Sequence, residues 1–355
     1  MLNIAVTGFL TSLKTSGLRL RLIAIYSGLI GGNLLAWAWA IAALQLQPAL
    51  LGTALLAYSL GLRHAVDADH IAAIDNVTRK LMQDGQRPAS VGLFFSLGHS
   101  TVVILASAML GVTFWQFRRQ FDAFHQIGET LGTIVSAGFL LAVAIINVVI
   151  LAVLWRTFRR VTNGQPYMEE DLNQVLGGPG LLVRVLRPLF GLISQSWHMY
   201  PLGLLFGLGF DTATEVGLLG ISASQALHGV SIWSILIYPA LFTAGMSLVD
   251  TTDGVLMLGA YGWAFVKPVR KLYYNIVMTA LSVAIAVLVG AAEILGMTID
   301  RFHLKGPLWK SAGAFSDHFG TIGFLIIGLF AGCWMLSVVI YRVRGYNQLD
   351  ARNRG

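Results

Sequence analysis

The sequence predicts an all-α membrane protein with eight transmembrane helices, and three observations support this prediction. Only 12% of the 355 residues are Asp, Glu, Lys or Arg, against about 25% in a soluble domain, and 56% are hydrophobic. Eight apolar segments are each long enough to cross about 30 Å of hydrocarbon. Most of the 24 Lys and Arg residues lie in alternate connections between these segments. The composition excludes an ordinary soluble protein, and we expect residues 1–355 to form a single polytopic transmembrane domain.

The predicted spans follow from the apolar runs in chain order. The first run is too long for a signal peptide, so we interpret it as an uncleaved span. The second, fifth and sixth contain acidic residues and are assigned from the apolar sequence on either side. The eight segments are Leu22–Leu44, Leu50–Asp75, Val91–Val112, Leu131–Leu154, His198–Ser222, Ile232–Phe265, Leu272–Leu295 and Gly320–Tyr341. An even number of spans places both termini on one side of the membrane.

The basic residues predict which side the termini face. With a cytoplasmic N-terminus, most of them fall in cytoplasmic segments, among them Arg79, Lys80 and Arg87 after the second span. Both termini are therefore expected to be cytoplasmic, with a cytoplasmic N-terminal segment at 1–21 and a cytoplasmic linker at about 155–197. The net charge of +7 then reflects topology, and no basic stripe predicts nucleic-acid binding.

Four segments place polar residues inside the predicted spans. They are residues 63–70 (RHAVDADH), 98–101 (GHST), 209–215 (GFDTATE) and 245–253 (GMSLVDTTD). An ionisable group at a helix centre costs about 2.5–3.5 kcal/mol on insertion scales, so these groups must pair, bind an ion or line water. By contrast, we expect Glu293, at the outer end of the seventh span, to reach water.

The second span carries the densest polar segment. In a regular helix His64, Asp67 and His70 face one side, whereas Asp69 points to nearly the opposite side. Two imidazoles and a carboxylate can thus converge on one cation, and a helix break would let Asp69 turn inward or orient a histidine. Imidazole and carboxylate ligands without thiolate suit a first-row divalent ion. The alternative is a structural network of ion pairs between Arg63 and the acids.

The other polar segments also leave alternatives open. For His99 and Asn33, helix packing is the alternative to metal binding. The acids of the fifth and sixth spans form pairs that share a helix face, so they can partner basic and hydroxyl groups or line an ion path. These pairs are Asp211 with Glu215 and Asp250 with Asp253.

A short internal repeat is also visible. Leu60-Gly61 matches Leu208-Gly209, and Gly98-x-Ser100 matches Gly245-x-Ser247. Spans two and three would then correspond to spans five and six, and an offset of three helices inverts their orientation in the membrane. Inverted repeats of this kind favour a binding site near the midplane and alternating access.

The four polar segments together resemble the signatures of the nickel/cobalt transporter (NiCoT) family. The matching stretches are RHAVDADHI at 63–71, LGHSTVV at 97–103, LGFDTATE at 208–215 and GMSLVDTTDG at 245–254. The resemblance covers nearly the whole chain. It implies an eight-span permease of the bacterial inner membrane that takes up Ni²⁺ and, in some members, Co²⁺.

The resemblance also implies which residues act on the ion. The residues that correspond to the family's metal-binding positions are His64, Asp67, Asp69 and His70 in span two, Asn33 in span one and His99 in span three. The remaining signature residues, expected along the transport path or around the ligands, are Arg63, Asp211, Thr214, Glu215, Asp250 and Asp253.

We therefore expect high-affinity uptake of Ni²⁺, with Co²⁺ as a second candidate substrate, and no enzymatic activity. The metal ion and the lipid bilayer are the expected partners, no cofactor is expected, and no P-loop motif points to an ATPase. A membrane potential of about 100 mV, negative inside, favours entry of a divalent ion by about 4.6 kcal/mol. Because binding needs neutral imidazoles, uptake is expected to weaken as the pH falls through about 6.5, the pKa of an unperturbed histidine.

Two other functions remain open from the residues alone. An intramembrane Zn-dependent hydrolase would use a histidine-bound metal and a carboxylate base, but the sequence has no H-E-x-x-H motif. A divalent metal exporter would use similar ligands, but the 155–197 linker lacks the histidine-rich tract that such exporters often carry.

Overall fold

The computed structural model describes residues 16–45, 48–113, 118–163, 193–209, 213–227, 230–264, 268–304, 306, 309 and 319–343. All regular structure in these residues is helical. The elements are α2 (Ser16–Leu44), α3 (Pro48–His64), α4 (Ala68–Gln83), α5 (Val91–Thr113), α6 (Arg118–Thr162), η1 (Ser196–His198), α9 (Met199–Gly207), α10 (Ala213–Leu227), α11 (Ile232–Ile235), α12 (Ile237–Ala264), α13 (Pro268–Phe302) and α15 (Phe319–Val343).

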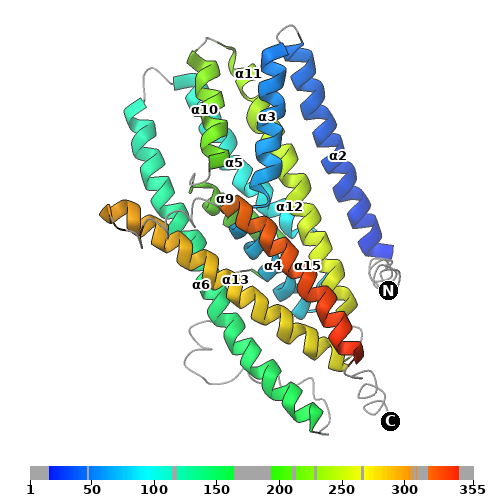
Figure 1. Cartoon of the computed structure of the whole chain (residues 1–355). Coiled ribbons are helices and arrows are strands. Elements are labelled where there is room, and N and C mark those ends of the chain that lie inside the picture. The colour runs from blue at the N-terminus through cyan, green and yellow to red at the C-terminus, as the bar shows by residue number, and fades with distance from the viewer. Residues whose placement is uncertain are drawn as a thin grey trace.

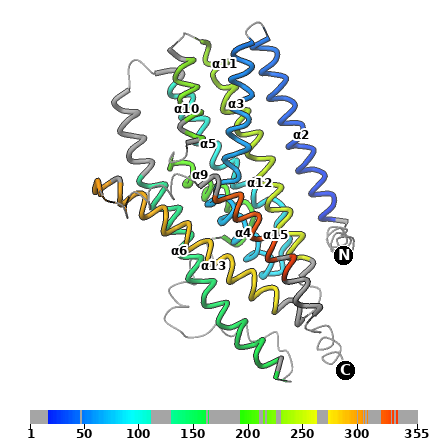
Figure 2. Tube along the Cα trace, in the orientation of Figure 1, coloured from blue at the N-terminus to red at the C-terminus, as the bar shows by residue number. Residues whose placement is uncertain are grey.

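The longer helices form one bundle, in which α13 packs across the long helix α6 (Figure 1). The short helix α9 lies among the longer ones, whereas α11 lies at the end of the bundle that is at the top in Figure 2. The start of α2 and the end of α15 lie toward the same end of the bundle (Figure 1).

The prediction of an all-α membrane protein is confirmed, but the described residues support fewer than eight spans. Each predicted segment coincides with a helix or with an interrupted pair of helices. The helices that are long and apolar enough to cross a membrane are Gly17–Leu44, Val91–Leu110, Thr130–Val161, Ile232–Gly262 and Tyr273–Ile299. The bent pair α3 and α4 is a sixth candidate if it counts as one span. The fifth predicted span is divided between α9, with 9 residues, and α10, with 15.

The second predicted span breaks in the middle of its polar segment. Helix α3 ends at His64, a turn follows, and α4 begins at Ala68 with a bend of 50° between the two helices. Asp67 precedes α4 in an extended conformation with φ −66° and ψ 148°, which is typical of an N-cap residue. Regular-helix geometry therefore does not extend from His64 to His70.

Helix α4 is polar and yet lies inside the bundle. An apolar cluster around it draws residues from α6, α12, α13 and α15. The buried polar residues of α4 are His70, Asp75, Asn76, Thr78 and Arg79. Buried polar groups need hydrogen-bond partners, so these residues specify what packs against α4.

Two charged residues lie deeper than the sequence suggested. Arg79 belongs to α4 and is only 1% exposed, so its assignment to a cytoplasmic loop is wrong. The error arose because α4 continues to Gln83, beyond the predicted end of the span at Asp75. Glu293 of α13 is also buried and accepts a hydrogen bond of 3.0 Å from the Ser136 hydroxyl of α6. The expectation that Glu293 reaches water is therefore wrong as well.

Glycines bring two pairs of helices into backbone contact. Gly61 of α3 lies against the backbone of Phe242 in α12, and Gly203 of α9 lies against the backbone of Phe95 in α5. A Cβ atom at either glycine would overlap the neighbouring carbonyl group. Close crossings through small residues are typical of helices that pack within a membrane.

Candidate metal site

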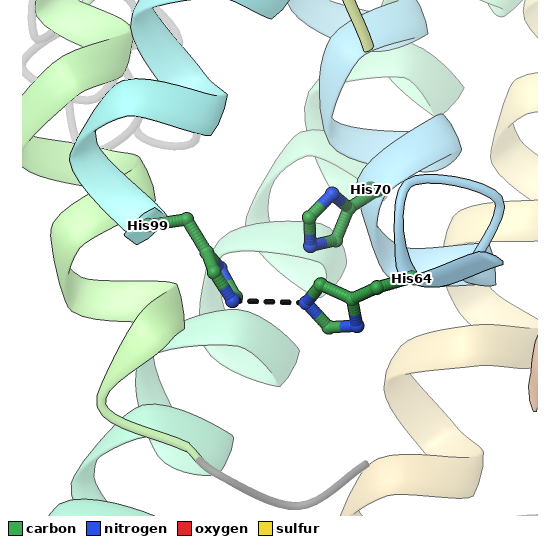
Figure 3. A group of neighbouring side chains, drawn as sticks. All are labelled: His64, His70 and His99. Carbon is green, nitrogen blue, oxygen red and sulfur yellow. Dashed lines mark hydrogen bonds between the residues drawn. The ribbon is translucent and has the colours of Figure 1, made fainter. Parts of the chain in front are cut away.

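Three histidines from three helices meet inside the bundle (Figure 3). His64 ends α3, His70 lies in the first turn of α4, and His99 lies within α5. One ring nitrogen of each residue lies within 4.8 Å of the corresponding nitrogens of the other two. All three residues are at most 2% exposed. We call this group the three-histidine cluster.

The break between α3 and α4 brings two members of the cluster together. Six residues of continuous helix would separate His64 from His70 by about 9 Å along the axis. In the structure their ring centroids lie 4.6 Å apart, and each centroid lies within 4.9 Å of the His99 ring centroid. The turn at 65–67 therefore folds both imidazoles toward α5.

A carboxylate contacts the Nδ1 atom in two of the rings. His64 Nδ1 lies 3.0 Å from Asp67 Oδ2 and 3.1 Å from the Thr214 hydroxyl of α10. His70 Nδ1 lies 3.3 Å from both carboxylate oxygens of Asp250 in α12. An Nδ1–H group that donates to a carboxylate leaves the lone pair on Nε2, which is the form of imidazole that binds a metal ion.

The Nε2 atoms of His64 and His99 lie beside a further carboxylate, that of Glu215. His64 Nε2 and His99 Nε2 are 2.9 Å apart. Glu215 Oε1, from the first turn of α10, lies 2.8 Å from His99 Nε2 and 3.9 Å from His64 Nε2. His70 Nε2 is buried and has no hydrogen-bond partner among the described residues. Because an unsatisfied buried polar atom is costly, this nitrogen points to a ligand that the cluster receives.

Aromatic side chains close the cluster on two sides. The Phe95 ring of α5 packs edge-on against His70 with centroids 4.8 Å apart, and the Phe242 ring of α12 lies 5.4 Å from His64. These rings exclude water from the imidazoles. Sequence reasoning missed both residues, although each lies three positions before a glycine of the internal repeat, Gly98 or Gly245.

The family model described as NicO, high-affinity nickel-transport protein, matches residues 50–340, a range that includes the whole cluster. The chain belongs to the NicO family. The resemblance to nickel/cobalt transporters that the sequence motifs indicated is thereby confirmed.

Relatives of this NicO chain carry names that describe metal transport. The high-affinity nickel transport protein of Cupriavidus necator is 57% identical over 94% of this chain and 95% of its own length. The hydrogenase nickel incorporation protein HupN of Bradyrhizobium diazoefficiens is 50% identical over 90% and 83%. The cobalt transport protein NhlF of Rhodococcus rhodochrous is 39% identical over 80% and 81%. None of these names supports the hydrolase or the exporter. No solved structure matches the chain.

Two more of the predicted acids of the NicO chain each bury a carboxylate oxygen. Asp69 directly precedes His70 in the first turn of α4. Its Oδ1 atom is buried without a hydrogen-bond partner among the described residues. Asp253 follows Asp250 by about one turn of α12, and its Oδ2 atom is also buried without a hydrogen-bond partner among the described residues. The predicted path residue Asp211 lies outside the described residues.

Asn33 and Arg63 contact other parts of the NicO chain. Asn33 of α2 donates hydrogen bonds of 2.8 and 3.2 Å to the carbonyl groups of Leu29 and Ala244, and accepts one of 3.0 Å from the Tyr58 hydroxyl. It lines an open apolar groove of about 730 Å³ between α2, α5 and α12. Arg63 is exposed near the end of α3. The structure therefore gathers His64, His70 and His99 but does not bring Asn33 to them.

Proposed function

We propose that this NicO-family chain takes up Ni²⁺ with high affinity across the bacterial inner membrane. In this proposal three imidazoles and one carboxylate hold the ion in transit, and transport involves no covalent chemistry. The four residues are His64, His70, His99 and Glu215. The observation that carries the proposal is the convergence of three imidazoles and a carboxylate oxygen in a buried site inside a helical membrane protein. The names of the relatives support nickel as the substrate.

The donor atoms lie close enough together to approach a single ion. His64 Nε2, His99 Nε2 and Glu215 Oε1 are separated by 2.9, 2.8 and 3.9 Å. Two ligands of one ion with bonds of about 2.1 Å stand at most about 4.2 Å apart. A site of imidazole nitrogen and carboxylate oxygen without thiolate suits a first-row divalent ion such as Ni²⁺.

The remaining acids take supporting roles in the proposal. Asp67 was expected among the ligands, but its contact with Nδ1 favours a role in orienting His64. Asp250 orients His70 in the same way. Asp69 contributes negative charge beside the rings and remains a candidate ligand, because one of its oxygens has no other partner among the described residues.

Co²⁺ is proposed as a second substrate. A relative that is 39% identical carries the name of a cobalt transport protein. Ni²⁺ and Co²⁺ are neighbours in the order of affinity for nitrogen and oxygen ligands, so a site of this composition binds both.

We also propose eight spans with cytoplasmic termini and entry of the ion from the outer face. The distribution of basic residues supports this topology. It is also supported by the positions of the start of α2 and the end of α15 at the same end of the bundle (Figure 1). A potential of about 100 mV, negative inside, then drives a divalent ion inward with about 4.6 kcal/mol.

Two helix crossings support an inverted repeat that relates α3 and α5 to α9 and α12. In the first crossing, the glycines and the backbone positions that they meet are Gly61 with Phe242, and Gly245 with Tyr58 and Leu62. In the second crossing they are Gly203 with Phe95, and Gly98 with Tyr200 and Leu204. Exchanging the two copies converts one set of contacts into the other. The sequence YSLGL at 58–62 then corresponds to YPLGL at 200–204.

This register differs from the sequence match. It pairs Gly61 with Gly203 and not with Gly209, whereas Gly98 still pairs with Gly245. In the shifted register Asp69 corresponds in sequence to Asp211. The interruptions also correspond, because α3 ends three residues after its glycine and α9 four residues after its own. The repeat therefore supports a site at the junction of two inverted halves.

Uptake of 63Ni into bacterial cells tests the proposed function. Cells with the wild-type chain are expected to accumulate the isotope, and cells with the His64→Ala/His70→Ala variant to accumulate no more than cells without the chain. The matched control is His303→Asn, which replaces an exposed histidine outside the cluster and is expected to keep wild-type uptake. Excess Co²⁺ is expected to compete more strongly than Zn²⁺. Wild-type uptake by the double variant, present in the membrane at normal amounts, would exclude the assigned site.

A further inference from the structure

A second buried polar group lies on α4, beyond the histidines in the direction of Gln83. Asp75 accepts a hydrogen bond of 2.5 Å from the Tyr261 hydroxyl of α12 and one of 2.6 Å from the Ser282 hydroxyl of α13. Asp75 is fully buried. Hydroxyl donors on both oxygens are the pattern expected for an ionised carboxylate, which can only accept hydrogen bonds.

Arg79 lies one turn further along α4 and is surrounded by neutral partners. Its Nη1 donates a hydrogen bond of 2.7 Å to the Thr279 hydroxyl of α13, and its Nη2 donates one of 3.0 Å to Asn76 Oδ1. The same Asn76 oxygen accepts a bond of 2.7 Å from Asn147 of α6. Within the described part of the chain, no carboxylate forms an ion pair with Arg79. Its charge is therefore not neutralised by direct contact and acts on its surroundings at a distance.

Three acids of α12 and α4 connect the three-histidine cluster with Arg79. They are Asp250, Asp253 and Asp75, and we call them the acidic line. Asp250 contacts His70, and Asp253 follows on the same helix. Gly254, next to Asp253 on α12, lies against Ile74 and Thr78 of α4, which are the neighbours of Asp75 and Arg79 in the chain. Of the Lys and Arg residues that the structure describes with their side chains, Arg79 alone is buried. The acidic line thus begins at the cluster and ends at an isolated positive charge.

We propose that Arg79 is a positioning residue for transport. Its positive charge limits how tightly the acidic line holds the ion, and the ion can therefore be released toward the end of α4. The proposal rests on the proposed uptake function. Nine residues separate His70 from Arg79, or about 13 Å of helix, a distance at which charges still interact strongly where water is excluded. Without Arg79, Asp75 and Asp253 would deepen the attraction for a divalent ion and retain it. In the proposed orientation, this end of α4 faces the cytoplasm.

A purely structural role makes a different prediction. The hydrogen bonds of Asn76 and Arg79 tie α4 to α6 and α13, and those of Asp75 tie it to α12 and α13. If these bonds only anchor α4, every substitution that breaks them lowers the amount of folded protein. The molecules that remain folded then bind Ni²⁺ with unchanged affinity. A role through charge instead shifts the affinity in opposite directions when the positive or the negative partner is neutralised.

Equilibrium binding of 63Ni to the purified full-length chain in detergent, together with uptake by cells, tests the proposal. Arg79→Gln is expected to bind Ni²⁺ about tenfold more tightly and to transport it at a lower maximal rate, because release is slowed. Asp75→Asn is expected to bind it about tenfold more weakly, because the charge of Arg79 is no longer compensated. Arg79→Lys keeps the charge without the guanidinium geometry and is expected to keep the wild-type Kd.

The outcomes separate this inference from the proposed function. The role of Arg79 is overturned, and the uptake function is left intact, if the wild-type chain takes up Ni²⁺ and either of two results is found for the variants. The first is that Arg79→Gln and Asp75→Asn bind Ni²⁺ with an unchanged Kd. The second is that both variants bind it more weakly to the same extent. A wild-type chain that neither binds nor takes up Ni²⁺ removes the uptake function and this inference with it. If Arg79→Gln yields no folded protein, Asp75→Asn decides alone, because its amide oxygen still accepts a hydroxyl hydrogen bond. An unchanged Kd in that variant then rejects the inference.

Discussion

Each imidazole of the three-histidine cluster has different neighbours, and these neighbours decide which nitrogen is available to an ion. His64 and His70 each have a carboxylate at Nδ1, from Asp67 and Asp250. His99 has Glu215 at Nε2, on the same side as the other two rings. Glu215 therefore lies where it can bind the ion together with the imidazoles, whereas Asp67 and Asp250 act on the other nitrogen of their rings.

Asp250→Asn tests this division of roles. The amide keeps the size of the side chain but loses the charge that fixes the Nδ1–H form of His70. We expect the KM for Ni²⁺ uptake to rise about 10- to 100-fold, as is typical when the partner of a metal-binding histidine is replaced. Asp84→Asn is the control, because Asp84 is a half-exposed residue that pairs with Lys80. An unchanged KM would exclude an orienting role for Asp250, and complete loss of uptake would indicate direct binding.

The sequence indicated the cluster residues because polar groups in apolar spans are costly and need a reason to be there. It did not distinguish orienting acids from binding acids, because that distinction depends on which nitrogen each carboxylate meets. Asp67 was expected to bind the ion, but its oxygen lies at Nδ1 of His64. Phe95 and Phe242 gave no signal of their own, since aromatic residues are ordinary in a membrane helix.

At the level of helices, the interruption between α3 and α4 shapes the site. Regular-helix geometry placed Asp69 away from His64, but the 50° bend lies between these two residues, so that geometry does not apply across the break. The sequence contained a signal for the break, because Asp67 and Asp69 are acids at the start of α4, where helices favour caps and negative charge. The end of α4 was missed for the opposite reason. Its polar residues 75–80 resemble a loop, and only the partners on α6, α12 and α13 explain why they are buried.

The crossing of α3 and α12 predicts an effect on stability. Gly61→Ala would place a methyl group on the Phe242 carbonyl, and we expect a loss of about 1–3 kcal/mol, as for other overpacked interiors. The control is Gly52→Ala in the same helix, where no atom lies within 4 Å of the added carbon. The measurement is the Tm of the purified protein in detergent. Equal Tm values for the two variants would show that the crossing is looser than described.

At the scale of the whole molecule, composition was enough to predict the class of fold but not the number of spans. Low charge and long apolar runs require a helical membrane protein. The described residues do not confirm the count of eight, because neither α9 nor α10 is long enough to span alone and α3 is joined to α4 through a bend. The same interruptions place backbone ends and polar side chains at the site, as is common in transporters. The helix interruptions that form the proposed site are therefore also the reason why the number of spans is difficult to predict from the sequence.

The bent pair α3 and α4 allows two topologies, which single cysteines can separate. Either the pair crosses the membrane once, or it enters and returns to the same side. Cys333 is the only cysteine, so Cys333→Ser gives a background without thiols. In that background Gln45→Cys and Gln86→Cys place a thiol before α3 and after α4, at exposed positions.

With cytoplasmic termini and one crossing by the pair, the two positions face opposite sides. In intact spheroplasts, a membrane-impermeant maleimide is expected to label the cysteine at position 45 and to leave that at position 86 unlabelled until the membrane is opened. The expectation follows from Lys80 and Arg87, which are not buried and lie at or beyond the predicted cytoplasmic end of α4. Labelling of both positions from outside would mean that α3 and α4 return to the outer face. The acidic line toward Gln83 would then lead away from the cytoplasm and could not serve as the exit for the ion.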